Sequence, residues 1–257
     1  MLSLLPKKEI PKMVDWLEKT FAKTRQTKAI IGLSGGLDSA IVAYLAARAL
    51  RPKDVICVKL PYKTSTGSSV IDADKVIKLL DVGSREIDIT KIANSFESGL
   101  NETDQLRFGN VLARIRMTIL FDIAAENNGI VLGTSNKSEL LLGYGTMHGD
   151  LASIINPIGG FYKSQIRLLA EYLDIPSEII EKTPSADLFE GQTDEKDLGF
   201  SYKQADEIMY SIFDEGNSKM KTTNLGYDMD DINEVLNRVE SNKFKGEVPY
   251  TYNLKKY

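Results

Sequence analysis

An apolar run that stops at two glycines constrains the fold of this chain more than any other feature. The apolar residues 29–31 lead into the sequence Gly-Leu-Ser-Gly-Gly-Leu-Asp-Ser, and apolar residues then recur at helical spacing over residues 41–50. A strand that feeds a glycine turn at a helix start presents free N–H groups and the positive end of the helix dipole to an anion. The glycines let the backbone approach a phosphate group where a Cβ would collide. The segment 32–39 is therefore predicted to bind a phosphate.

The side chains of this turn add chemistry to the backbone site. Ser34 and Ser39 supply hydroxyl donors, and Asp38 is placed to hold a Mg²⁺ that phosphates share. No lysine follows the glycines as in a Walker A loop. The written pattern, Ser-Gly-Gly-x-Asp-Ser, resembles the pyrophosphate loop of the N-type ATP pyrophosphatases, which cleave ATP between the α and β phosphates. The alternative is an ordinary strand–helix turn without a ligand, in which Asp38 only caps the helix.

Strand-like and helix-like segments alternate along the first half of the chain. Strands are predicted at residues 54–60, 84–89 and 130–132, and helices at 7–23, 71–80 and 106–127. This alternation predicts an α/β fold with a doubly wound, mostly parallel sheet and helices on both faces. The 257 residues suit one domain over 1–257. Ligands in such sheets bind at the carboxyl ends of the strands, where Ser34, Pro61 and Gly133 fall.

The second half is less regular. Residues 140–158 are rich in glycine, helices are predicted at 163–173, 202–213 and 230–239, and the acidic segment 187–199 is a candidate mobile lid. The helix at 7–23 is amphipathic and is expected to pack on the core or on a second subunit.

Composition excludes several classes of protein. The net charge of −4 argues against nucleic-acid binding by bulk electrostatics, and no apolar stretch has the length of a membrane span. One cysteine permits no intrachain disulfide, which fits a cytoplasmic location, and one cysteine with one histidine excludes a His/Cys zinc cluster.

Five further motifs follow one another after the predicted phosphate-binding segment 32–39, which is called the phosphate turn below. They cover residues 109–117 (GNVLARIRM), 133–150 (GTSNKSE, then GY, T and GD), 157–165 (PI, then YKSQ), 183–187 (TPSAD) and 191–195 (GQTDE). Together they resemble the ammonia-dependent NAD synthetases, and the resemblance extends over about residues 7–250. It implies the adenine nucleotide α-hydrolase-like fold and amidation of deamido-NAD by ammonia, with ATP as co-substrate, Mg²⁺ and a homodimer.

The resemblance also implies roles for individual residues. Asp38 and Glu139 correspond to the Mg²⁺ carboxylates, and with Lys163 and Ser185 they form the catalytic set. ATP binding is implied for Gly32, Leu33, Ser34, Gly35, Gly36, Leu37, Asp38, Ser39, Thr134, Lys163 and Ser185, and deamido-NAD binding for Arg114, Asp150 and Lys245. Five of these residues also have a structural alternative: a helix cap for Asp38, a turn or cap hydroxyl for Thr134, a solvated helix face or start for Glu139 and Lys163, and an internal ion pair for Arg114.

The chain departs from the family pattern on the acyl-substrate side. Met147 stands where family members commonly carry Lys, Ile154 where they carry Asp, and Phe244-Lys245 where a His-Lys pair is common. Either other groups hold the dinucleotide or the acyl substrate differs; we favour the former, because the motifs around Arg114 and Ser185 remain.

The mechanism implied by the resemblance begins with adenylation. The nicotinate carboxylate attacks the α-phosphorus of ATP, pyrophosphate leaves, and ammonia attacks the NAD-adenylate to release NAD and AMP. Cys57, in the middle of an apolar strand, is predicted to be a buried core residue, so free ammonia is the expected nitrogen source and no glutaminase domain is expected.

Two other functions stay open at this point. One is another N-type ATP pyrophosphatase, such as a GMP synthetase-like amidating ligase, and the other is a non-catalytic nucleotide-binding module. A homodimer is expected to use an apolar stripe on the helix at 106–127, formed by Leu106, Phe108, Val111, Leu112, Ile115 and Ile119. The same stripe is equally suited to face its own sheet.

Overall fold

A parallel sheet forms the centre of the computed structural model, which describes residues 4–65, 67–100, 104–185 and 193–247. The strands stand in the order β3-β2-β1-β4, and each is parallel to its neighbours. Their bounds are Lys28–Gly32 (β1), Val55–Lys59 (β2), Gly83–Glu86 (β3) and Gly129–Leu132 (β4). This sheet confirms the predicted doubly wound α/β class.

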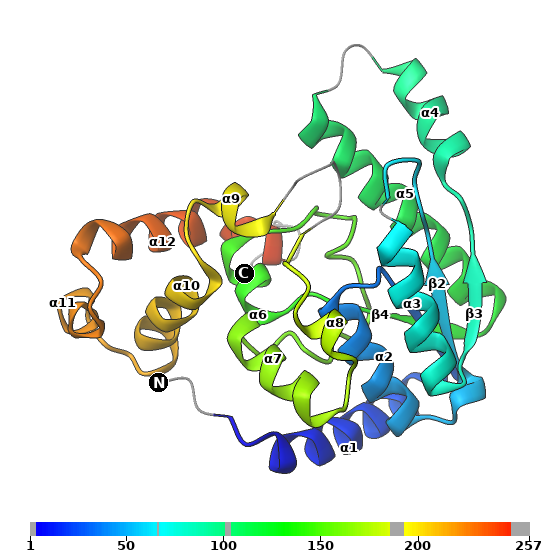
Figure 1. The fold of residues 1–257 in the computed structure, drawn as a ribbon, viewed down its shortest axis with the longest axis horizontal. Coiled ribbons are helices and arrows are strands. Elements are labelled where there is room, and N and C mark those ends of the chain that lie inside the picture. The colour runs from blue at the N-terminus through cyan, green and yellow to red at the C-terminus, as the bar shows by residue number, and fades with distance from the viewer. Residues whose placement is uncertain (1–3, 66, 101–103, 186–192, 248–257) are drawn as a thin grey trace, which may run out of the picture.

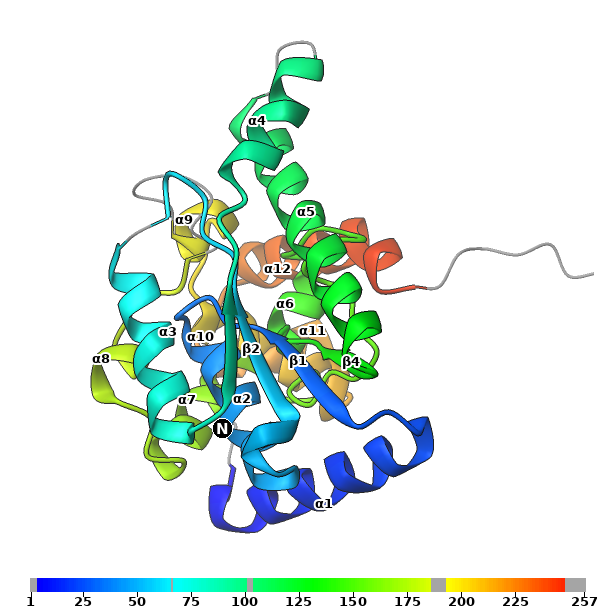
Figure 2. The same cartoon turned by 90° about the vertical axis from the view of Figure 1, so that its right-hand side faces the viewer.

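Alternate side chains of the buried strands face two separate apolar cores. On β1, Ala29 and Ile31 join one core and Ile30 joins the other. Helices from both halves of the chain cover the first face: α1 (Pro6–Thr24), α2 (Leu37–Ala49), α3 (Gly67–Leu80), α7 (Lys163–Tyr172) and α8 (Ser177–Ile180). The second face is covered by α4 (Thr90–Gly99) and α5 (Gln105–Glu126). In Figure 2, α3 and α8 lie to the left of β2 and α5 lies to its right.

A helical lobe with its own apolar core stands beside the sheet, at the left of Figure 1. It consists of α6 (Lys137–Leu142), α9 (Asp194–Leu198), α10 (Tyr202–Met209), α11 (Lys219–Thr222) and α12 (Met229–Asn242). A π-helical turn, Tyr210–Asp214, continues α10 and ends the helix predicted at 202–213. Because α6 belongs to this lobe and also follows β4, the lobe and the sheet meet at the carboxyl edge of the strands.

The predicted elements agree with the structure except in polar and glycine-rich segments. The strand predicted at 84–89 is shorter, Gly83–Glu86, and all of its residues are exposed. The helices α4, α6, α8, α9 and α11 were not predicted. The first has a single fully buried side chain, and each of the other four spans only four to six residues. Residues 187–192 of the lid predicted at 187–199 lie outside the described residues, whereas Asp194–Leu198 forms α9.

The amphipathic helix α1 packs on its own core, since Leu17 and Phe21 are buried there. Among the described residues, no helix combines the length and the apolar character needed to cross a membrane.

Candidate active site

The turn between β1 and α2 is closed by two serine side chains. The Oγ atoms of Ser34 and Ser39 lie 3.1 Å apart, and Ser39 Oγ donates to the Gly36 carbonyl at 3.0 Å. Gly36 is the N-cap residue of α2 and offers no side-chain cap. Gly36 therefore does not cap the N–H groups of the first helical turn, and N–H groups at a helix N-terminus suit the binding of a phosphate.

Gly35 sits against the backbone of α3. Its φ is +78°, and a Cβ built on it would lie 2.1 Å from the Ser69 carbonyl oxygen. Lys182 joins the same two segments, because its Nζ donates to the Gly35 carbonyl at 3.4 Å, to Ser69 Oγ at 3.1 Å and to Asp72 Oδ2 at 2.8 Å. The phosphate turn is thus held between α2 and α3, and sequence reasoning did not find the contribution of Lys182.

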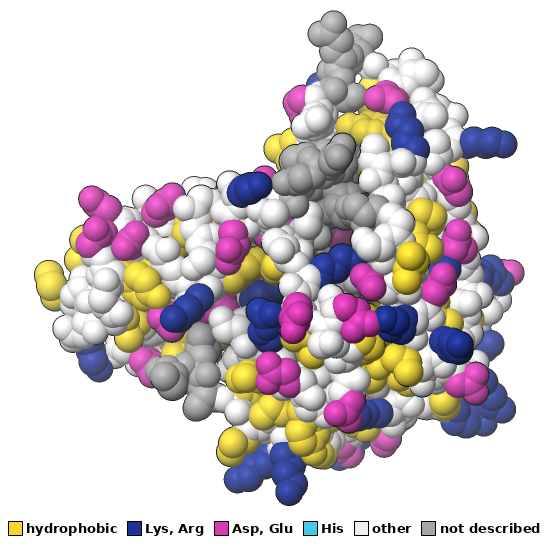
Figure 3. Space-filling view, viewed as in Figure 1, with side chains coloured by type: hydrophobic (Ala, Val, Ile, Leu, Met, Phe, Trp, Pro, Cys, Tyr) yellow, Lys and Arg dark blue, Asp and Glu magenta, His cyan; other side chains and the backbone are white. Residues whose placement is uncertain are grey.

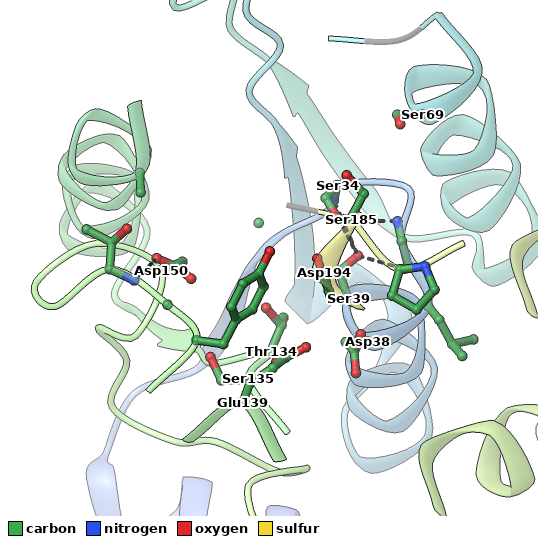
Figure 4. A pocket seen from close by; sticks show the side chains of 18 of the residues that line it. Ser34, Asp38, Ser39, Ser69, Thr134, Ser135, Glu139, Asp150, Ser185 and Asp194 are labelled. Atoms are coloured by element: carbon green, nitrogen blue, oxygen red, sulfur yellow. Dashed lines mark hydrogen bonds between the residues drawn. The ribbon is translucent and has the colours of Figure 1, made fainter. Parts of the chain in front are cut away.

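Two carboxylates and an ammonium from three helix N-termini meet below this turn. Lys163 Nζ, at the start of α7, lies 2.5 Å from Asp38 Oδ2 and 3.3 Å from Glu139 Oε1. Asn136 positions both acids: its Nδ2 donates to Asp38 Oδ1 at 3.0 Å, and it forms a capping box with Glu139 at the start of α6. Figure 4 shows Asp38 and Glu139 lining the same pocket as the serines of the turn.

Burial gives this cluster unusual electrostatics. The side chains of Asp38, Glu139 and Lys163 are only 17%, 14% and 11% exposed. Burial raises the pKa of Glu139; Lys163 opposes the rise, and Asp38 adds to it by repulsion. Burial also opposes the charge of Lys163, but attraction by Asp38 and Glu139 is stronger and raises the pKa of the amine. The site therefore holds a permanent cation between two acids.

A third acid, Asp194 of α9, stands beside the cluster. It is 4% exposed, and its Oδ2 accepts a hydrogen bond from the Tyr202 hydroxyl at 3.1 Å. Burial raises its pKa, and Lys163 opposes that rise. Asp194 belongs to one of the recognised motifs, yet sequence reasoning gave it no role.

A cavity of about 1930 Å³ opens over the turn and the acid cluster, and Figure 4 shows part of its lining. Its volume exceeds the several hundred to roughly 1,000 Å³ of an ordinary small-molecule site, so it has room for two nucleotides. The predicted site residues that line it are Gly32, Leu33, Ser34, Gly36, Leu37, Asp38, Ser39, Thr134, Glu139, Asp150, Lys163, Ser185 and Lys245. Gly35 and Arg114 are outside this lining.

The residues expected to hold the dinucleotide lie around the loop after α6. Lys245 Nζ donates to the Gly143 carbonyl at 2.7 Å, and Asp150 Oδ1 accepts from the Thr146 N–H at 2.8 Å. Arg114 is exposed on α5, and its Nε donates to the Met147 carbonyl at 3.3 Å. These contacts bring the three predicted residues to one loop, although Arg114 stands outside the cavity wall.

The site also contains a guanidinium that sequence reasoning missed. Arg238 of α12 lines the cavity, and its Nε donates to the Leu142 carbonyl at 3.3 Å. Nothing in the local sequence around Arg238 marks it, because helix α12 reaches the cavity only through the packing of the lobe.

The fold and this arrangement of motifs match a known family. Residues 9–249 match the family described as NAD synthase. The chain belongs to the NAD synthase family. The resemblance drawn from the ordered motifs is thereby confirmed, and a GMP synthetase-like ligase is not supported.

Three relatives are similar to this chain over nearly their whole length. The NH(3)-dependent NAD(+) synthetase of Fusobacterium nucleatum is 42% identical over 244 residues, 95% of each chain. The solved NH3-dependent NAD synthetase of Campylobacter jejuni, in complex with the nitrate ion, has a TM-score of 0.84 and 35% identity over 97% of this chain and 100% of its own. The NMN synthetase of Francisella tularensis also has a TM-score of 0.84, with 33% identity over 98% of this chain and 100% of its own.

Proposed function

We propose that this chain is an ammonia-dependent NAD synthetase, which converts deamido-NAD, ammonia and ATP into NAD, AMP and pyrophosphate through an NAD-adenylate. The observation that carries the proposal is the meeting of Asp38, Glu139 and Lys163 beneath the phosphate turn. It supplies a pyrophosphate site in a chain whose curated relatives are NH(3)-dependent NAD(+) synthetases.

The residues of the turn act on the leaving pyrophosphate. A carboxylate is a poor electrophile, so the nicotinate group is first joined to the α-phosphorus of ATP, and negative charge then builds on the β and γ phosphates. We propose that the N–H groups at the start of α2, the hydroxyls of Ser34 and Ser39 and the ammonium of Lys163 stabilise that charge; the contact of the two serines and the position of Lys163 beside Asp38 support this role. Thr134 and Ser185, which line the same cavity, are proposed to contact ATP.

The donor set fits Mg²⁺. Asp38 and Glu139 both present hard carboxylate oxygens to Lys163 Nζ, and Mg²⁺ typically takes one or two carboxylates together with phosphate oxygens. When bound, Mg²⁺ neutralises charge on the leaving phosphates. Before substrate binds, Lys163 balances the two acids.

Arg114, Asp150 and Lys245 are proposed to bind deamido-NAD. Arg114 and Lys245 carry positive charge to the loop after α6, and a planar guanidinium can hold a phosphate through two hydrogen bonds. Arg238 places a further guanidinium on that side, which supports binding of the dinucleotide despite Met147 and Ile154.

The deciding experiment is turnover of the purified chain with ATP, Mg²⁺, ammonium and deamido-NAD. We expect NAD, AMP and pyrophosphate in equal amounts. Formation of ADP and phosphate would contradict the proposal, and ATP binding without any turnover would identify a non-catalytic nucleotide-binding module.

A second candidate substrate is deamido-NMN. The similarity to the Francisella tularensis NMN synthetase supports it, as does the loss of two charged groups at Met147 and Ile154. A comparison of kcat/KM for the two acids separates the candidates. We expect deamido-NAD to be the better substrate, because two curated NH(3)-dependent NAD(+) synthetases are 42% and 50% identical to this chain and the NMN synthetase is 33% identical.

We predict that ammonium alone supports turnover and that glutamine does not. Cys57 is fully buried in β2, and burial raises the pKa of its thiol to about 12, so it is not a nucleophile. Apparent activity should rise with pH up to the pKa of ammonium, because only NH₃ has a lone pair for attack on the adenylate. Cys57→Ser should leave the ammonia reaction intact, and glutamine-supported synthesis lost on that substitution would contradict the prediction.

We also propose a homodimer, on a surface that keeps Leu106 of the stripe expected from sequence but not the buried members of that stripe. Leu112 and Ile115 of that stripe are buried against the chain's own sheet, whereas Leu106 is 67% exposed. On α4, Ile92 and Phe96 are also exposed, and Figure 1 shows α4 and the start of α5 projecting beyond the sheet. Exposed apolar patches of this kind favour association.

Light scattering should therefore give twice the 28.6 kDa chain mass, and Phe96→Glu with Leu106→Glu should give the single mass. An unchanged mass in the double variant would place the interface elsewhere.

We further propose one catalytic domain over residues 1–257 and a cytoplasmic location, where ATP is available.

A further inference from the structure

A fully buried carboxylate, Asp206 of α10, lies where the N-termini of α6 and α7 meet. Its Oδ1 accepts a hydrogen bond from Ser138 Oγ at 2.5 Å. Its Oδ2 accepts two from Ser164, from the N–H at 2.8 Å and from Oγ at 2.6 Å. One acid of the helical lobe thus holds the first turns of two helices at the edge of the sheet.

Each hydrogen-bond partner of Asp206 is next in sequence to a residue of the cluster formed by Asp38, Glu139 and Lys163. Ser138 precedes Glu139 on α6, and Ser164 follows Lys163 on α7. Ser138 also joins the two helices directly, because its Oγ accepts the Lys163 N–H at 2.8 Å. The spacing between Glu139 and Lys163 therefore depends on one network centred on Asp206.

The cost of burying Asp206 argues that its role exceeds packing. Burial raises the pKa of this acid, and the hydrogen bonds from Ser138 and Ser164 and the charge of Lys163 oppose the rise. The neighbouring side chains Ala205, Ile208 and Met209 are all apolar and fully buried. In such a core, replacement of a buried polar network by well-packed apolar groups is often neutral or stabilising, so packing alone does not call for a carboxylate.

We propose that Asp206 is a positioning residue for the amidation reaction: through Ser138 and Ser164 it fixes Glu139 and Lys163 at the separation that the adenylation step requires. The proposal rests on the proposed function. Asp206 itself does not line the cavity, so it acts through its neighbours and not on the substrate.

The test is steady-state kinetics of Asp206→Asn, which keeps the volume of the side chain and removes one acceptor. We expect kcat to fall by about 10- to 100-fold, while KM for ATP and for deamido-NAD changes by less than about 3-fold. The reason is that Glu139 and Lys163, which the substitution displaces, act on charge that develops in the transition state.

The matched control is Thr222→Val, which removes a fully buried hydroxyl of the same lobe that pairs with Ser211 Oγ at 2.9 Å. It should lower the thermal midpoint and leave kcat within about 2-fold, since the Thr222 hydroxyl pairs with Ser211 Oγ and donates to the Ser218 carbonyl, and neither residue belongs to α6 or α7.

A second variant tests the same network independently. Ser138→Ala removes the hydroxyl between Asp206 and the Lys163 N–H, and its loss in kcat should not add to that of Asp206→Asn, because both changes break one connection. If Asp206→Asn does not fold, an unchanged kcat in Ser138→Ala overturns the positioning role. A wild-type chain that makes no NAD refutes the proposed function and this proposal with it. An active wild type with an equally active Asp206→Asn refutes the positioning role alone.

Discussion

Asp38→Asn and Glu139→Gln should each lower turnover by at least about 100-fold, as loss of a group that stabilises transition-state charge does. Each change removes one of the two acids around Lys163 and one proposed Mg²⁺ ligand, while the shape of the side chain stays the same. NAD formation under saturating ATP and deamido-NAD measures the effect.

The two variants should differ in stability for a physical reason. Burial already disfavours the charge of Glu139, and a Gln amide oxygen can still accept the Asn136 N–H of the capping box, so the thermal midpoint of Glu139→Gln should stay near the wild-type value. Asp38→Asn turns an acceptor of Lys163 into a potential donor, so a modest decrease in the thermal midpoint is expected.

The control is Asp54→Asn, which breaks the ion pair with Arg51 near the opposite end of β2 and should leave turnover unchanged. Near-normal turnover in both site variants would show that neither acid serves the chemistry.

Sequence patterns predicted the sheet and the phosphate turn because both depend on local signals. The strands β1 and β2 are continuous apolar runs, and the turn has glycines where the backbone passes close to α3. Such features can be recognised in a stretch of about ten residues, without knowledge of the rest of the chain. The exposed strand β3 has no such pattern, and its extent was predicted less well.

The rest of the site depends on contacts between segments far apart in the chain. Lys163 and Asp38 are separated by 125 residues, and Lys182 and Ser69 by 113. The resemblance placed Lys163 in the site because a motif contains it. Lys182, Arg238 and Asp206 were missed, since only the packing of the segment after α8, of α12 and of α10 brings them to the edge of the sheet. Single-sequence periodicity carries no information about these pairings.

Gly35→Ala should reduce kcat/KM for ATP by at least about 100-fold, because it distorts the backbone donors that bind the leaving phosphates. The added methyl group would lie 2.1 Å from the Ser69 carbonyl oxygen, which belongs to a helix backbone and cannot swing away like a side chain. The turn or α3 must therefore move, and the contacts of Lys182 with both segments move with it.

A matched variant separates this collision from backbone strain. Gly226 also has a positive φ, +95°, but a Cβ built there meets nothing within 4 Å. Gly226→Ala should therefore show only the cost of a left-handed alanine, about 1 kcal/mol in unfolding free energy, with normal turnover. Gly35→Ala should lose stability beyond that value as well as ATP turnover. If the two variants instead lose equal stability and Gly35→Ala keeps its kcat/KM, the close approach of the turn to α3 does not shape the pyrophosphate site.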